Sequence, residues 1–256
     1  MDRRFSNGLQ FAASYTWSKF IDSTSDAAGG ASNQDPITTL ANITSVPVMQ
    51  GGMRLDRGVS AFDRPQRLTV SYLWDIPGPR ANWLRSTLGG WVLGGITTLQ
   101  SGTPFSVGNG TDRNGDGILE DRPDIGNIKA PLNTRAILYS ACATGYQNFD
   151  TGSCVSPSEV HWVQGVGFPN GATVGRYTLR TGGTNNFDLN LTKAIRLGET
   201  RRLEFRWEAL NALNHPQFVQ VPMRSVNGNT PQGQFLNRDL TDSGIRSMWV
   251  QMKLVF

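Results

Sequence analysis

Apolar and polar residues alternate along several stretches of this chain. Between Leu9 and Lys19, the odd positions up to 17 hold Leu, Phe, Ala, Tyr and Trp, whereas the even positions hold Gln, Ala, Ser and Thr. Because successive side chains of a strand point to opposite faces of its sheet, this period of two predicts a strand with one apolar and one polar face. A strand of about ten residues spans a lipid bilayer when it is tilted.

The same period of two predicts a strand in five further segments. It is clearest at 202–210, where Leu, Phe, Trp and Ala alternate with four charged residues, sets that a helix would mix on one surface. In the last segment, Trp249 lies at a polar position and breaks the pattern. The five segments are Arg67 to Ile76, Trp91 to Gln100, Asn185 to Ile195, Arg202 to Leu210 and Arg246 to Phe256.

The connections between these strands alternate in length. Those from Lys19 to Arg67, Ser101 to Gly183 and Ala212 to Gly244 are long, whereas IPGPRANWLRSTLGG and RLGET are short. Membrane barrels show this arrangement, with short periplasmic turns and longer outer loops. We therefore predict an all-β fold, an antiparallel transmembrane β-barrel segment of about six C-terminal strands with long extracellular loops. A soluble β-sandwich is the alternative, but such long connections are uncommon in compact domains.

The composition agrees with membrane strands and excludes other classes. Only 17% of the residues are charged, and no run of eighteen apolar residues occurs, which excludes a transmembrane helix. The 24 basic residues are scattered without forming a dense patch, so nucleic acid is not an expected partner.

Several segments of the chain resemble the last strands of Oar-like TonB-dependent transporters, outer-membrane receptors with a carboxypeptidase regulatory-like domain. The segments are RRFSNGLQFAASYTWSK, FDRPQRLTVSYLWDIP, GWVLGGITTLQSGTPFSV, NNFDLNLTKAIRLGETRRLEFRWEALNALNHPQF and IRSMWVQMKLVF. The resemblance implies a location in the bacterial outer membrane and a twenty-two-stranded barrel with a plugged lumen. It also implies a role in substrate uptake, with the strands forming the wall and the loops forming the outer vestibule.

On this resemblance, we expect residues 1–256 to be the C-terminal part of such a barrel, with the plug and N-terminal domains absent. Single-chain barrels begin at eight strands, so six strands are expected to form an incomplete barrel. The implied partners are outer-membrane lipid, the missing N-terminal plug and barrel portion, and the barrel-assembly machinery. TonB would bind only through the absent N-terminal part.

A segment in the longest connection resembles the first half of a calcium-binding loop. Asp112, Asn114 and Asp116 alternate and are followed by Gly117, and Asp121 is one of the carboxylates that could close the site. Position twelve of this loop is a proline, where calcium loops have a bidentate Glu. The alternative is a polar loop tip with Asn-Gly and Asp-Gly turns. Calcium is the one cofactor that the sequence suggests.

The two cysteines, Cys142 and Cys154, lie in the same long connection and lack a zinc-binding spacing. Oxidising compartments favour a disulfide between them, and two free thiols are the alternative.

The chain ends on an apolar row that is formed by Val250, Met252, Leu254 and Phe256. The family resemblance implies that the barrel-assembly machinery reads this row as an assembly signal. The alternative is a chain end that happens to be aromatic.

Arg202, Glu204, Arg206 and Glu208 form a charge ladder on the polar face of one predicted strand. Such residues lie within reach of one another along a strand and across neighbouring strands. The ladder is either structural or part of a substrate path through the lumen.

Two other functions fit parts of the sequence. In a secreted β-rich glycan-binding module, Trp17, Tyr72, Trp74 and Trp207 would stack on sugars, but these residues share their parity with aliphatic residues, which favours lipid contact. An outer-membrane hydrolase would need a catalytic histidine. Neither His161 nor His215 lies in a nucleophile motif, so we do not expect an enzyme.

Overall fold

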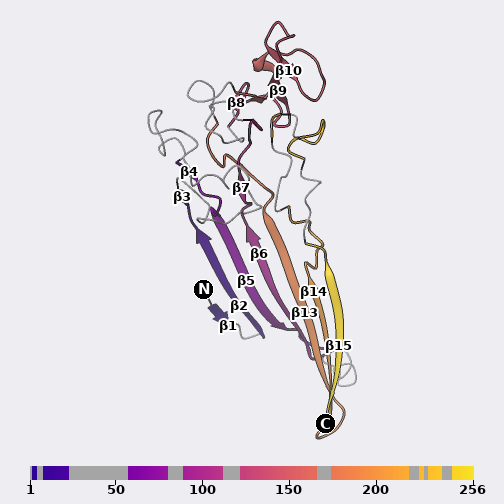
Figure 1. Cartoon of the computed structure of the whole chain (residues 1–256). Helices are drawn as coiled ribbons and strands as arrows, with labels where there is room; N and C mark the ends of the chain where they lie inside the picture. The colour runs from indigo at the N-terminus through magenta and orange to yellow at the C-terminus, as the bar shows by residue number, and fades with distance from the viewer. Residues whose placement is uncertain are drawn as a thin grey trace, which may run out of the picture.

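A computed structural model describes residues 2–4, 8–22, 57–79, 89–111, 122–165, 174–218, 225–227, 230–237 and 244–256. Its main feature is a seven-stranded antiparallel sheet in the order β1-β2-β5-β6-β13-β14-β15 (Figure 1). These strands are β1 (Asp2–Arg4), β2 (Leu9–Trp17), β5 (Gln66–Asp75), β6 (Trp91–Gln100), β13 (Thr184–Arg196), β14 (Arg202–Leu210) and β15 (Ser247–Val255).

The predicted all-β fold class is confirmed. The six predicted strands are present, and their ends differ from the prediction by two residues or fewer. The seventh strand, β1, was not predicted, because three residues are too short to show a period of two. In the part of the chain that the structure describes, β1 and β15 are the two edges of the sheet, which is therefore open.

The register of the sheet places apolar residues beside apolar residues on one face. In an antiparallel pair, side chains of directly opposite residues lie on the same face. One row of such partners crosses six strands and contains only apolar residues: Leu9, Trp74, Leu93, Leu191, Trp207 and Val250. A shift of one residue in any pairing would move a strand's apolar set to the polar face. The alternation therefore specifies the register as well as the strands.

A glycine in the middle of β6 makes room on this apolar face. Gly95 lies opposite Tyr72 on β5 and Leu189 on β13. A Cβ atom at position 95 would lie 2.6 Å from the Tyr72 ring, so a larger residue would displace this ring.

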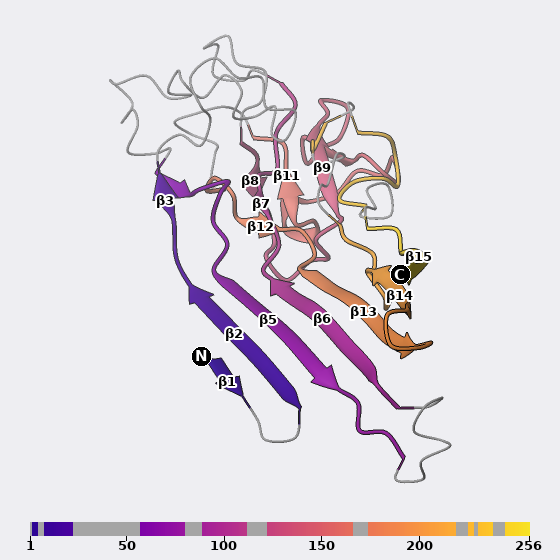
Figure 2. The same cartoon turned by 90° about the horizontal axis from the view of Figure 1, so that it is seen from below.

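The two ends of the sheet carry connections of different length, as the alternation along the sequence predicted. The β13–β14 turn and the C-terminus lie at one end, and the long connections lie at the other (Figures 1 and 2). We call this second end the loop end. Here a second sheet has the order β10-β9-β11-β8, formed by β8 (Asp124–Ile125), β9 (Arg135–Leu138), β10 (Tyr146–Asn148) and β11 (Trp162–Val163). Two small pairs, β3 (Ile21–Asp22) with β4 (Gly58–Val59) and β7 (Pro104–Phe105) with β12 (Leu179–Arg180), also lie here.

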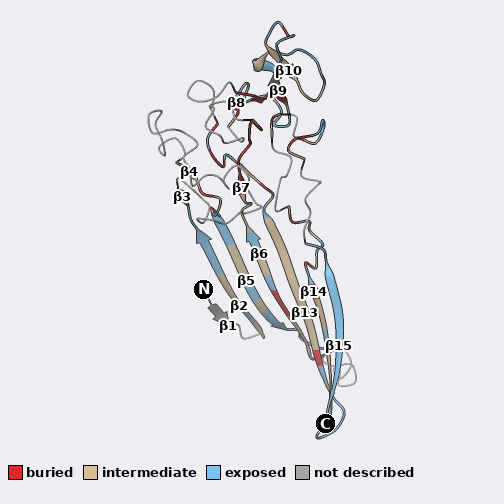
Figure 3. Cartoon of the chain, viewed as in Figure 1, coloured by how far each residue is buried: buried red, intermediate tan, exposed pale blue. Residues whose placement is uncertain are grey.

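Most buried residues lie at the loop end and few lie in the main sheet (Figure 3). The larger apolar cluster joins two of the long connections and consists of Val107, Trp162, Val174, Val226 and Phe235. A smaller cluster of Ala136, Val160 and Val163 lies within the second sheet. Among the described residues, no helix is long and apolar enough to cross a membrane.

Candidate functional site

The main sheet presents its apolar face as an exposed surface. Near the loop end of β2, Tyr15 and Trp17 are 62% and 80% exposed. On the edge strand β15, Met248, Val250, Met252 and Leu254 are each about half exposed. A face of this size without a covering layer is unusual in a soluble protein and is typical of a surface that contacts lipid or a partner.

One charged residue, Lys193, lies on this apolar face and was not predicted there. It is opposite Trp91 on β6 and Phe205 on β14, and only 6% of its surface is exposed. Its Nζ lies 5.1 Å from the centre of the Trp91 ring, which packs edge-on against Phe205 with 5.6 Å between centroids. Lysine near the end of a strand can keep its stem among apolar groups while an aromatic face attracts the ammonium. The only sequence signal was a lysine at an apolar position of the pattern.

The four predicted ladder residues lie together on the opposite, polar face. Ion pairs join Arg202 to Glu204, with Nε and Oε1 2.7 Å apart, and Arg206 to Glu208. Exposed pairs of this kind contribute about 0.2–1 kcal/mol each, so they orient the side chains more than they stabilise the sheet. Neighbouring strands place Lys253 opposite Glu204 and Trp249 opposite Glu208. Trp249, which broke the alternation, is thus an aromatic residue of the polar face.

Arg135 at the start of β9 fastens two of the long connections to each other. Its side chain is fully buried, and it pairs with Asp150, where Nη2 lies 3.1 Å from Oδ1. The guanidinium also lies 4.4 Å from the centre of the Phe149 ring and 4.9 Å from that of Phe235. It donates to carbonyl oxygens of the β14–β15 connection, namely those of Ser225, Val226, Asn227, Thr230 and Pro231.

Asp63 fastens the first long connection to the second. Its carboxylate pairs with Arg180, and its Oδ1 accepts a hydrogen bond from the Phe20 backbone N–H at 2.7 Å. The neighbouring Arg64 donates to Thr103 at 3.0 Å. Burial, and then the nearby charge of Arg180, lower the pKa of Arg64, whereas Asp63 raises it. The three long connections thus form one body above the sheet.

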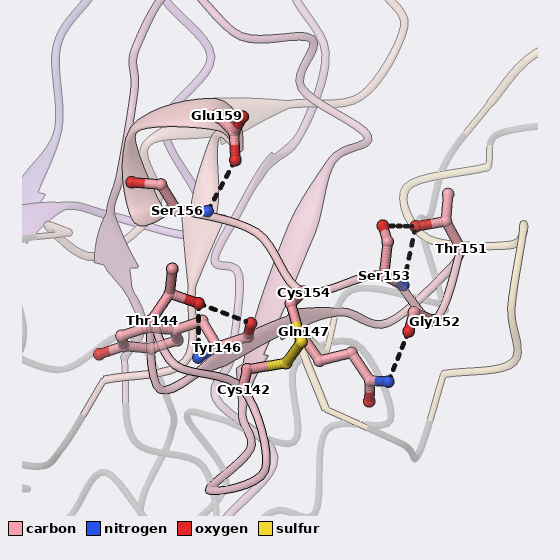
Figure 4. The surroundings of a disulfide bond; sticks show 10 residues. All are labelled: Cys142, Thr144, Tyr146, Gln147, Thr151, Gly152, Ser153, Cys154, Ser156 and Glu159. Carbon is pink, nitrogen blue, oxygen red and sulfur yellow. Dashed lines mark hydrogen bonds between the residues drawn. A yellow bond between two sulfur atoms is a disulfide. The ribbon is translucent and has the colours of Figure 1, made fainter.

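Cys142 and Cys154 form a disulfide at the tip of this body (Figure 4). Their Cα atoms are 5.4 Å apart, and Gln147 of β10 bridges to Cys154 through the backbone. The bond closes the β9–β10 hairpin onto the segment that follows it. Next to it, Ser156 and Glu159 cap a short 3₁₀ helix (Pro157–Glu159) through reciprocal hydrogen bonds.

A comparison with protein families agrees with this geometry. The family model for the outer membrane beta barrel domain matches residues 1–247. The chain belongs to this family. It is therefore a protein of the bacterial outer membrane. In such barrels the outward face is apolar, and we call the apolar face of this sheet the lipid face. A search of curated proteins and a search of solved structures gave no match.

The apolar row that the sequence singled out lies along β15 and just after it, beyond the family match. The family match stops at Ser247, where β15 begins, and hydrogen bonds along β14 place this strand in the sheet. Val250, Met252 and Leu254 lie on the lipid-contacting face, and Phe256 follows the strand with 82% of its surface exposed. The row is exposed along β15, and its role as an assembly signal stays a prediction.

The predicted calcium-binding loop belongs to the long connection between β6 and β13. Asp112, Asn114, Asp116 and Asp121 all lie outside the described residues. Within the described parts of the barrel domain, no cluster of three or more His, Cys, Asp or Glu side chains could hold a metal ion.

Both histidines of the barrel domain make contacts that are typical of structural residues. His161 is buried, contacts the Ala130 carbonyl through Nδ1 at 3.0 Å and packs against Trp162. The backbone N–H of His215 donates to Oδ1 of Asn211. These contacts support a role in the core for His161 and a role in a turn for His215.

Proposed function

We propose that this barrel domain forms part of the wall and the outer vestibule of a TonB-dependent receptor that takes up a substrate across the outer membrane. The observation that carries the proposal is the joining of three long connections into one body at the loop end, through Arg135 and Asp63. A barrel that only anchors a protein needs no such fastening between its loops. A rigid outer body can hold a substrate above the lumen before transport.

The polar face of the sheet supports the same proposal. Its residues alternate with those of the lipid face, so they would line the interior of a closed barrel. Arg202, Arg206 and Lys253 interleave with Glu204 and Glu208 on this face, which gives a hydrated, charged wall. Such a wall suits a water-filled lumen or the polar surface of a plug. The resemblance of the penultimate hairpin to Oar-like transporters supports the plugged form.

The exposed apolar face and the neighbours of His215 count against the two alternative functions. A secreted glycan-binding module would not need an exposed face of apolar residues that is continuous across six strands. A hydrolase would need a histidine beside a nucleophile, whereas the described side chains that hydrogen-bond to His215 are the amides of Asn185, Asn211 and Gln217. We therefore propose a transport role and no enzymatic activity.

The test is to purify the protein, expressed from its complete reading frame, out of bacterial outer membranes and to measure two properties. A TonB-dependent receptor should retain the purified periplasmic domain of TonB on a column. It should also conduct ions in a planar bilayer only after denaturant displaces its plug. A barrel that conducts steadily without denaturant and retains no TonB contradicts the proposal.

A further inference from the structure

A small cleft at the loop end separates two of the long connections. It has a volume of about 170 Å³ and lies between the β9–β10 region and residues 233–235. Its lining is mostly uncharged and polar, and consists of Asn133, Thr134, Asn148, Asp150, Thr151, Gly233 and Phe235. Clefts that bind drug-sized ligands measure roughly 300–1,000 Å³, so this one admits a single ring or a group of similar size.

The one carboxylate in the cleft, that of Asp150, is held in place and neutralised. Arg135 donates to both of its oxygens, with Nε 3.2 Å from Oδ2 and Nη2 3.1 Å from Oδ1. The Gly233 backbone N–H donates to Oδ1 at 2.9 Å. These bonds use three of the four acceptor positions of a carboxylate, so one position remains for a ligand donor. Because the guanidinium cancels the charge, the pair does not attract a cation strongly.

The arginine beneath the cleft is equally unsuited to an anion. Arg135 is fully buried, and its N–H groups donate to Asp150 and to backbone carbonyls. A phosphate or sulfate would have to break these bonds and desolvate at the same time. The cleft therefore favours a neutral ligand.

Asn148 places a donor next to the Asp150 acceptor. Its Oδ1 accepts hydrogen bonds from the backbone N–H groups of Asp150 and Thr151, at 2.9 and 3.0 Å. This fixes the side-chain amide, whose NH₂ group remains as a donor. Asn133 adds an exposed amide at the rim, and Phe235 forms an apolar wall. The Thr151 hydroxyl at the rim is hydrogen-bonded to the Ser153 hydroxyl. Adjacent donors and acceptors beside an aromatic ring match vicinal hydroxyl groups, each of which donates and accepts.

We propose that this cleft binds a neutral polyhydroxylated ligand, namely one sugar ring of a glycan at the cell surface. The inference goes beyond the uptake function, because binding at this site requires neither a pore nor TonB. A barrel that transports nothing could still capture a glycan here, and a receptor could bind its substrate elsewhere.

The experiment measures binding of the methyl glycosides of glucose, galactose and mannose to the purified protein in detergent, by saturation-transfer NMR. Asn148→Asp keeps the acceptor for the two backbone groups but removes the donor, and Asn133→Met narrows the rim without breaking a core contact. Each variant should weaken binding of the preferred glycoside at least tenfold. The control is Ala143→Met, an exposed position of the same connection outside the cleft, which should bind as the wild type does.

Three outcomes overturn the proposal. The first is that no glycoside in the panel binds, and the second is that binding persists unchanged in both cleft variants. The third is that calcium or phosphate, added alone, perturbs the protein in a way that Asn148→Asp abolishes, while this variant leaves sugar binding unchanged. Because none of these measurements involves transport, they leave the uptake proposal to its own test.

Discussion

The ammonium of Lys193 lies 5.1 Å from the centre of the Trp91 ring, on the face of the sheet that contacts lipid. A charge near the middle of a bilayer would be costly, but Lys193 is three residues from the end of β13. At this depth a lysine can reach the interface, and the aromatic face attracts its charge by about 0.5–2 kcal/mol.

We therefore predict that Lys193→Glu destabilises the folded protein more than Lys193→Met does. The carboxylate faces the negative π-face of Trp91, whereas methionine keeps the apolar packing and loses only the cation–π attraction. Urea titration of the protein refolded in lipid vesicles measures both free energies of unfolding. Equal stability of the two variants would show that the charge of Lys193 has no role.

The two faces of β13 should respond differently to the same substitution. Leu189 lies on the lipid face near the middle of the strand, and Asn190 lies on the polar face beside it. Leu189→Arg should cost about 2–4 kcal/mol in free energy of unfolding near the bilayer midplane, whereas Asn190→Arg should cost less. The same titration in vesicles compares them. Similar losses at both positions would contradict the assignment of the lipid face.

The main sheet could be predicted from the sequence because each strand is long enough to repeat its alternation. From Arg202 to Leu210, both the strand bounds and the ladder on one face follow from the pattern alone. The loop end could not be predicted, because β7, β8 and β11 have only two residues each. Its core brings distant segments together, such as those that place Trp162 and Val226 in one cluster. Arg135 could not be identified from the sequence, because the carbonyl groups that it binds lie about ninety positions away along the chain.

The fastening of the loops through Arg135 leads to a third prediction. Arg135→Met removes the guanidinium while keeping much of its length. The Asp150 carboxylate then loses its ion pair but keeps the Gly233 N–H, and several carbonyls lose a donor. Breaking a buried pair in this way costs about 3–5 kcal/mol. The cost should appear as faster amide hydrogen exchange in residues 225–227 and 230–237, with exchange in the main sheet unchanged. Arg201→Met, in the β13–β14 turn at the other end of the sheet, is the control and should leave the loops protected.

The disulfide gives a fourth prediction. In protein isolated without reductant, neither Cys142 nor Cys154 should react with maleimide, and both should react after reduction and unfolding. Labelling of both thiols in the unreduced protein would contradict the bond. The double variant Cys142→Ser and Cys154→Ser should destabilise the loop end by roughly 3 kcal/mol, as expected for closing a loop of about this length. Proteolysis of the outer loops on intact cells compares this variant with the wild type.

The last prediction concerns Phe256, which is 82% exposed beyond the end of β15. An aromatic residue here would anchor the strand at the membrane interface. If the assembly machinery also recognises the exposed edge by strand pairing, the loss of Phe256 should lower the yield of inserted protein more than its stability once inserted. We would compare deletion of Phe256, Phe256→Asp and the conservative Phe256→Tyr, each in the complete reading frame, in a Gram-negative host.

The control is Ile245→Asp, because Ile245 is 88% exposed but precedes the strand. The assembly signal predicts that the deletion and Phe256→Asp reduce the protein in the outer-membrane fraction severalfold and increase its degradation in the periplasm. Phe256→Tyr and Ile245→Asp should insert normally, since both keep an aromatic terminus. A terminal aromatic without a role in assembly predicts instead that all four variants reach the outer membrane equally. That result would leave Val250, Met252 and Leu254 as lipid-contacting residues only.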